Sequence, residues 1–238
     1  METPTRVLGD IVSGLLDLVY PPFCLSCGKL GADYLCPECV DKIDLIKPPC
    51  CLKCGIPYPS AYCPDCRLRE FSFRSARAAG VYEGVLRDAI HSLKYHCHLV
   101  VADVLAAIMV GSFSQSGFAG QVDVVVPVPI HRSRLVERGF NQSAELARRL
   151  CKRLNLSLER DVLWKEKKTR HQVDLPEEQR TTNVRGAFAV RNVESIWQKR
   201  VLLVDDVLTT GSTASECARI LVEAGAARVY VYTLARSL

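Results

Sequence analysis

The stretch Val201-Leu-Leu-Val-Asp-Asp-Val-Leu-Thr-Thr-Gly-Ser-Thr213 decides the fold class of this chain. Its first four residues are apolar, as expected for a buried central strand of a parallel sheet. The acidic pair Asp205 and Asp206 follows at the carboxyl end of that strand, where open α/β sheets bind their ligands. Hydroxyl residues and Gly211 then form a turn that opens a helix. The free N–H groups at a helix start favour the binding of a phosphate.

Together these features predict a site for a ribose 5-phosphate. The turn would bind the phosphate, and the two carboxylates would accept hydrogen bonds from paired hydroxyls of the sugar. Gly211 would let the backbone approach the ligand closely, because glycine has no side chain. We assign Asp205 and Asp206 as the catalytic residues. The expected ribose-phosphate-binding residues are Asp205, Asp206, Thr209, Thr210, Gly211, Ser212 and Thr213.

Three other interpretations of this stretch compete with the ribose-phosphate site. Ser212 or Thr213 can serve only as a helix cap, but this leaves the acidic pair unexplained. A receiver domain also carries an acidic pair after an apolar strand, but early in its domain, whereas only 32 residues follow Asp206. A nucleotide-binding P-loop needs a Lys after its last glycine, and Ser212 follows Gly211 instead.

The remainder of the chain after residue 74 alternates predicted strands and helices. Strands are expected at 76–82, 122–128, 201–204 and 228–234. Helices are expected at 84–110, with a break near 96–98, and at 141–154 and 212–224. Loops are expected at 112–120 and 164–184, and the second is long enough to serve as a lid over a site. This alternation predicts an α/β fold, a parallel sheet flanked by helices on both faces.

A cysteine-rich repeat precedes this domain. Two copies of P-P-x-C-x-x-C-G-x7-C-P-x-C follow one another at an offset of 27 residues. Four CxxC pairs in tandem favour two structural zinc ions over a redox function, because an all-thiolate set leaves no open metal position. A crossed pairing between the two repeats remains open, and Cys50 aligns with Phe23, so we expect no metal on it. The expected ligand sets are Cys24, Cys27, Cys36 and Cys39, and Cys51, Cys54, Cys63 and Cys66.

Length and charge limit the remaining possibilities. The 238 residues suffice for one α/β domain and a small appendage. Residues 131–200 contain 17 Lys and Arg against 9 Asp and Glu, a local balance of +8 that suggests an anionic partner. The apolar stretch 7–20 is too short for a membrane span and contains Asp10 and Asp17. We therefore expect a cytoplasmic chain with reduced thiols.

These patterns divide the chain into three parts. Residues 1–20 are expected to form an N-terminal amphipathic helix, residues 21–70 a double zinc ribbon, and residues 71–238 the α/β domain.

Several motifs resemble those of type I phosphoribosyltransferases, and in particular the ComF/GntX family of competence-associated proteins. They are the double zinc ribbon, Leu93-Lys-Tyr95, Val126-Pro-Val-Pro-Ile-His131, Glu137-Arg-Gly-Phe-Asn-Gln142, and the stretch 201–213. Trp164-Lys165 and His96-Cys-His98 depart from the family pattern, which leaves the lid and acceptor contacts uncertain. The resemblance covers nearly the full length of the chain.

The resemblance implies binding of phosphoribosyl pyrophosphate (PRPP) with Mg2+, and a part in DNA uptake during natural competence. In such transferases the loop after the strand at 122–128 holds pyrophosphate, which implies roles for Arg132, Arg134, Arg138 and Gly139. If the chain is an enzyme, it is a phosphoribosyltransferase with an unknown acceptor. The alternative is a competence factor that handles single-stranded DNA without catalysis. Single-stranded DNA and other competence proteins are the macromolecular partners that the resemblance suggests.

Overall fold

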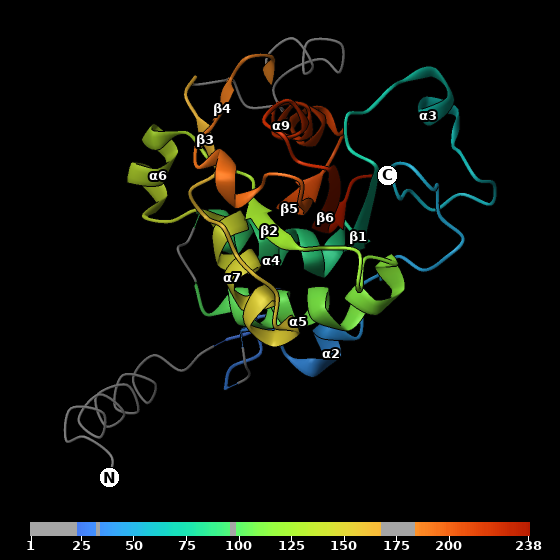
Figure 1. Cartoon of the computed structure of the whole chain (residues 1–238). Helices are drawn as coiled ribbons and strands as arrows, with labels where there is room; N and C mark the ends of the chain where they lie inside the picture. Colours follow the sequence, from blue (N-terminus) through green and yellow to red (C-terminus); the bar gives the residue numbers. More distant parts are fainter. Residues whose placement is uncertain (1–22, 32–33, 96–98, 168–183) are drawn as a thin grey trace.

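The computed structural model of the chain describes residues 23–31, 34–95, 99–167 and 184–238. Its centre is a parallel sheet of four strands in the order β1-β6-β5-β2 (Figure 1). The strands are β1 (Ser75–Val81), β2 (Val124–Pro127), β5 (Arg200–Leu208) and β6 (Arg228–Arg236). The predicted α/β fold with a parallel sheet is thereby confirmed.

Helices cover both faces of this sheet. One face packs against α4 (Gly84–Tyr95), α5 (Val101–Phe113) and α7 (Gln142–Leu154), and the other against α9 (Ser212–Glu223) (Figure 1). Leu202 and Val204 belong to the first core, and Val201 and Leu203 to the second. This alternation explains why the strand is apolar at every position, since successive side chains of a strand point to opposite faces.

Strand β5 is longer than the sequence suggests. The predicted strand ended at residue 204, but β5 continues to Leu208, so the acidic pair lies inside it. The reason is the neighbouring strand, because β6 pairs with β5 as far as Leu208 opposite Arg236. These backbone hydrogen bonds override the low strand propensity of aspartate. Strand β2 ends at Pro127 opposite Val204, so the acidic pair projects beyond β2.

Both loop predictions need correction. The predicted loop 112–120 is partly helical, since α5 runs to Phe113 and the 3-10 helix η1 spans Ser114–Ser116. The predicted loop 164–184 begins inside β3 (Leu163–Lys165), which pairs antiparallel with β4 (Phe188–Val190). Strands of three residues give no readable alternation. Residues 168–183 of the predicted lid and the expected helix at 1–20 lie outside the described residues.

The two cysteine modules pack on different parts of the domain. The first, with α2 (Pro37–Val40), shares a hydrophobic core with α4 and α5. The second, with α3 (Pro64–Leu68), lies at the opposite side of the molecule (Figure 1). The segment 44–53 between the modules follows the edge of β1 that β6 leaves unpaired. Its backbone hydrogen bonds join Ile46 to Ala79, Asp44 to Val81 and Lys53 to Ala76.

Two short elements complete the structure near the sheet. Helix α6 (Arg132–Arg138) follows β2, and the 3-10 helix η3 (Val193–Ser195) precedes β5. Among the residues described, no helix is both long and apolar enough to cross a membrane.

Candidate functional site

The two carboxylates of β5 have different partners. Both oxygens of Asp206 are engaged, because Oδ2 lies 2.8 Å from Nζ of Lys94 and Oδ1 accepts the N–H of Val207 at 2.7 Å. In Asp205, Oδ1 accepts the hydroxyl of Ser143 at 2.7 Å. Its Oδ2 has no hydrogen-bond partner within the described parts of the chain. Asp205 is therefore the carboxylate that remains available to a ligand.

Burial and neighbouring charges shift the pKa values of Asp205 and Lys94. Burial and the nearby charge of Asp206 raise the pKa of Asp205 to about 7, although the Ser143 hydroxyl and Lys94 oppose the rise. Burial lowers the pKa of Lys94, but the charge and hydrogen bond of Asp206 outweigh it, so this pKa is raised. Asp205 consequently changes its protonation close to neutral pH, while Lys94 stays charged.

The predicted phosphate turn follows β5 directly. Gly211 adopts a φ of 80°, a left-handed conformation that favours glycine, and serves as the N-cap of α9. The side chain of the N-cap residue cannot cap the helix, and the N–H of Ser212 makes a long hydrogen bond of 3.5 Å to the hydroxyl of Thr210. A helix start of this kind is suited to an anion. The hydroxyls of Thr210 and Ser212 lie 3.0 Å apart. The structure thus places the acidic pair and the hydroxyl-rich turn on one continuous stretch.

The three predicted pyrophosphate arginines of α6 have different surroundings. Arg132 is exposed, and Arg134 is half-buried. Arg138 is buried, with its guanidinium 5.1 Å from the centre of the Tyr95 ring and a hydrogen bond to Gln142. Gly139 ends the helix with a φ of 77°. Arg138 therefore packs against Tyr95 at the end of α4 rather than facing solvent. Tyr95 directly follows Lys94 in the sequence.

Three contributing residues were not assigned to the site from sequence. Lys94 pairs with Asp206, and Ser143 bonds Asp205, as described above. Lys165 of β3 lies beside His131, and its pKa is lowered by burial and by the charge of Arg134. Ser143 stands directly after the quoted Arg-Gly-Phe-Asn-Gln motif, and Lys94 within Leu93-Lys-Tyr95. These motifs could have drawn attention to Lys94 and Ser143. Their contacts with Asp206 and Asp205 could not be predicted without knowing the fold.

The eight predicted cysteine ligands gather into two clusters. Within each, all four sulfurs lie within 4.8 Å of one another, and the clusters follow the sequential pairing, not a crossed one. Tetrahedral zinc with bonds of about 2.3 Å places its sulfurs about 3.8 Å apart. The observed separations are 3.7 Å for Cys27 to Cys36 and 3.7 Å for Cys54 to Cys63. Both clusters are consistent with zinc sites, and Cys50 belongs to neither.

The second cysteine module touches the phosphate turn through the linker that follows α3. A Cβ on Gly211 would stand 3.0 Å from the ring of Phe71. The N–H of Ser72 donates to the hydroxyl of Ser215 at 3.0 Å. Phe71 also stacks on Phe73, with ring centres 4.9 Å apart. The exit of the second module therefore covers one side of the turn.

A parallel sheet with an acidic pair, a glycine-opened phosphate turn and two four-cysteine clusters defines a phosphoribosyltransferase-type domain joined to a double zinc ribbon. Comparison with known proteins agrees. The sequence matches the family described as "Double zinc ribbon domain" over residues 15–67 and "Phosphoribosyl transferase domain" over residues 95–238. The chain belongs to the ComF family, which combines these two domains.

Three relatives illustrate this membership. The chain is 31% identical to "DNA utilization protein YhgH" of Escherichia coli, over 66% of this chain and 70% of that protein. It is 33% identical to "Competence protein F" of Haemophilus influenzae, over 48% of this chain and 51% of that protein. It is 28% identical to "Competence protein ComFC" of Bacillus subtilis, over 69% of this chain and 65% of that protein.

Proposed function

We propose that the chain binds PRPP at the carboxyl end of β5. The observation that carries this proposal is the free Oδ2 of Asp205 in the same stretch as the turn at Gly211. The carboxylate would accept the ribose hydroxyls, and the first N–H groups of α9 would hold the 5-phosphate. Thr209, Thr210, Ser212 and Thr213 supply the remaining hydroxyls. Asp206 contributes by holding Lys94 rather than by direct contact with the sugar.

The residues available for Mg2+ fit an ion that is carried by PRPP. Magnesium prefers oxygen ligands and keeps several waters, so few protein ligands are needed. Asp205 offers one carboxylate oxygen for this purpose. The chemistry that Mg2+ would supply at this site is the neutralisation of negative charge on the diphosphate. Helix α6 follows β2 and carries Arg132 and Arg134, with Gly139 as its C-cap. By the family resemblance, these residues would contact the pyrophosphate.

The proposed reaction is a displacement at C1 of the ribose. A bond forms from the acceptor to C1, and the bond from C1 to the pyrophosphate oxygen breaks with its electron pair on that oxygen. In its ionised form, Asp205 would stabilise the positive charge that develops on the sugar ring. The pKa of Asp205 is about 7, so at or below neutral pH its carboxyl group is partly protonated. Ligand hydroxyls favour the ionised carboxylate, so binding would release a proton from Asp205.

Calorimetry with PRPP and Mg2+ tests the proposal on the zinc-loaded chain. Asp205→Asn should weaken binding by about tenfold or more, equal to at least about 1.4 kcal/mol. Asp88→Asn is the matched control, since Asp88 is a half-buried residue of α4 whose ion pair, among the described residues, is with its neighbour Arg87. Unchanged affinity in Asp205→Asn would refute the assignment of the site.

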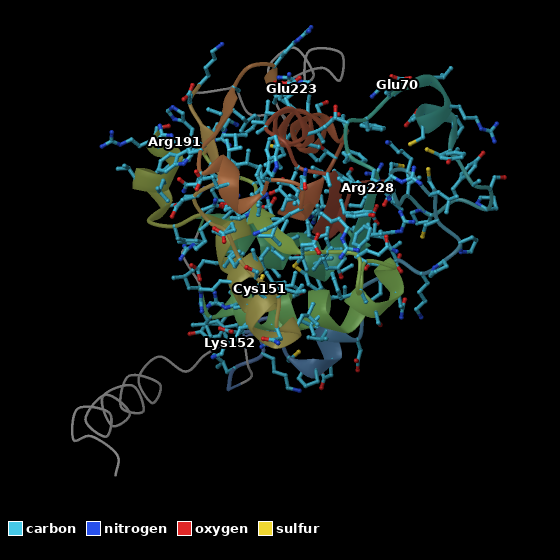
Figure 2. The ribbon with its side chains drawn as sticks, viewed as in Figure 1. Glu70, Cys151, Lys152, Arg191, Glu223 and Arg228 are labelled. Atoms are coloured by element: carbon cyan, nitrogen blue, oxygen red, sulfur yellow. The ribbon has the colours of Figure 1, made fainter. Side chains whose placement is uncertain are left out.

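A second function has its own support. The names of the relatives concern competence and DNA utilization. On the hairpin of β3 and β4, Trp164 is 41% exposed and the guanidinium of Arg191 lies 4.4 Å from its ring centre. Figure 2 places Arg191 at this side of the molecule, near α6. An exposed aromatic ring with adjacent cations suits stacking on the bases of single-stranded DNA.

We infer that handling of single-stranded DNA accompanies the sugar-phosphate site, with or without catalysis. Binding of an oligonucleotide should weaken steeply as salt is added, because phosphate contacts release counterions. Trp164→Ala should lower the affinity at every salt concentration without changing that slope. The exposed Trp197 provides the control substitution. A flat response to salt would contradict this function.

A further inference from the structure

A cavity of about 250 Å³ lies between the second cysteine module and the phosphate turn. Its walls come from both parts of the protein. They include Cys54, Cys66, Phe71, Thr209, Thr210 and Arg236. The cavity therefore adjoins the proposed ribose-phosphate site, at the carboxyl ends of β5 and β6.

Arg236 is the unusual residue of this cavity. It is only 7% exposed, yet its guanidinium has no hydrogen bond or carboxylate partner in the described parts of the chain. Its Nε is fully buried and has no hydrogen-bond partner among the residues that the structure describes. A buried charge is costly unless another group pairs with it. Asp65, Arg69 and Leu238 also line the cavity, and the sulfurs of the second cluster lie beside it through Cys54 and Cys66.

The other walls offer a flat surface and hydroxyls. Phe71 is half-buried, and its stacking on Phe73 fixes the orientation of its ring. Thr209 and Thr210 are also half-buried and can donate or accept hydrogen bonds. An aromatic wall, a cation and two hydroxyls are the groups that recognise a planar ring with an acidic substituent.

We propose that this cavity binds a small planar acid, with its ring against Phe71 and its acidic oxygens on Arg236. The volume is below the range of about 300–1,000 Å³ typical of sites for drug-sized ligands, so a single ring fits better than a nucleotide. The cavity borders Thr209 and Thr210 of the turn, so the acid would lie beside the phosphate end of bound PRPP, a placement that rests on the proposed function. The second cysteine module would then form one wall of a second ligand site beside the turn.

The test uses the full zinc-loaded chain and two probes, benzoate and orotate, observed by ligand NMR. Benzamide serves as the uncharged probe. Both acids should bind the wild type, and benzamide more weakly. Arg236→Gln should weaken the acids about tenfold or more, as expected for loss of a charge-assisted contact. Arg228→Gln is the matched control, because Arg228 is the exposed first residue of β6, whereas Arg236 is its last.

A rival explanation is that Arg236 only balances the charge of the thiolate cluster. Zinc content is therefore measured on every sample. If Arg236→Gln loses zinc, Phe71→Leu decides, because that substitution alters the wall and leaves the cluster intact. Acid binding equal to the wild type in Phe71→Leu would then overturn the proposal. So would wild-type binding in a zinc-replete Arg236→Gln, or failure of both acids to bind the wild type at about 10 mM.

The outcome is separable from that of the proposed function. PRPP binding is measured by calorimetry on the same samples, and Arg236→Gln should leave it unchanged. If the acids bind through Arg236 but PRPP does not bind, the cavity stands and the phosphoribosyl function falls. If PRPP binds and the acids do not, only the cavity proposal falls.

Discussion

Nζ of Lys94 lies 2.8 Å from Oδ2 of Asp206, and this ion pair joins the end of α4 to the strand beneath it. The side chains are only 18% and 7% exposed, respectively. The pair accounts for two acidic residues standing side by side in a largely buried strand. One of them is neutralised by Lys94, which leaves the other, Asp205, to meet the ligand.

Breaking this pair on one side should be costly. Lys94→Met leaves the carboxylate of Asp206 buried without a partner, and we expect a loss of about 3–5 kcal/mol in the free energy of unfolding. Lys94→Met with Asp206→Asn should recover much of this loss, because the carboxylate that had lost its partner is then also removed. Urea unfolding of the two single variants and the double variant measures both effects. A double variant as unstable as Lys94→Met would contradict the interpretation.

The control for this comparison is the pair of Lys29 and Glu38, which has a similar distance of 2.8 Å but lies on the surface. Lys29→Met should change stability far less, since solvent screens exposed pairs.

Asp205 should make stability depend on pH in an unusual direction. Its pKa is about 7 in the fold, against an ordinary value of 3.8. Between these values the folded state holds a proton that the unfolded chain has lost, so rising pH favours unfolding. Wild type should therefore lose stability relative to Asp205→Asn from about pH 4 to pH 7. Thermal unfolding of both proteins across this window tests the claim, and a constant difference would refute it.

Gly211 should resist substitution for two separate reasons. Its φ of 80° strains any other residue, and a Cβ would stand 3.0 Å from Phe71. Gly211→Ala should cost about 1 kcal/mol or more and weaken PRPP binding. Gly84→Ala is the control, because Gly84 also has a positive φ but has open space around its Cβ position. Equal losses in the two variants would mean that the contact with Phe71 contributes nothing.

The two zinc ions should leave at different rates. Cys27 of the first cluster is exposed, whereas the second cluster has three buried cysteines and one half-buried. We expect two zinc ions per chain and a faster release from the first cluster when a coloured chelator is added. Cys27→Ser should remove the fast phase and leave the slow one. A single phase for both ions would show that exposure does not control release.

The sequence is sufficient for the fold class and for the metal clusters, and the physical reasons differ. A four-residue apolar run followed by a polar turn reports burial directly, so the strand at residues 201–204 was correctly expected. Cysteine spacing reports a local geometry, and both clusters formed as the repeat suggested. The hairpin of β3 and β4 was missed, because its strands are too short for a periodic signal.

The candidate site was less accessible from sequence. The turn at Gly211 is local, and its conformation agrees with expectation. The pairing of Asp206 with Lys94 is not local, since 112 positions separate the two residues. The same holds for Ser143 and Asp205, which the hydrogen bond joins across 62 positions. Such contacts follow from the order of strands, which no short motif encodes.

The path of segment 44–53 along β1 affects how copies of the chain can associate with one another. An uncovered strand edge presents unpaired N–H and C=O groups to any neighbour, and such edges promote aggregation. Here Asp44, Ile46 and Lys53 already occupy those groups. The segment is tethered at both ends by a cysteine cluster, so loss of metal would loosen it and expose the edge. With both clusters loaded, we expect the segment to keep one copy of the chain from pairing with the sheet of another.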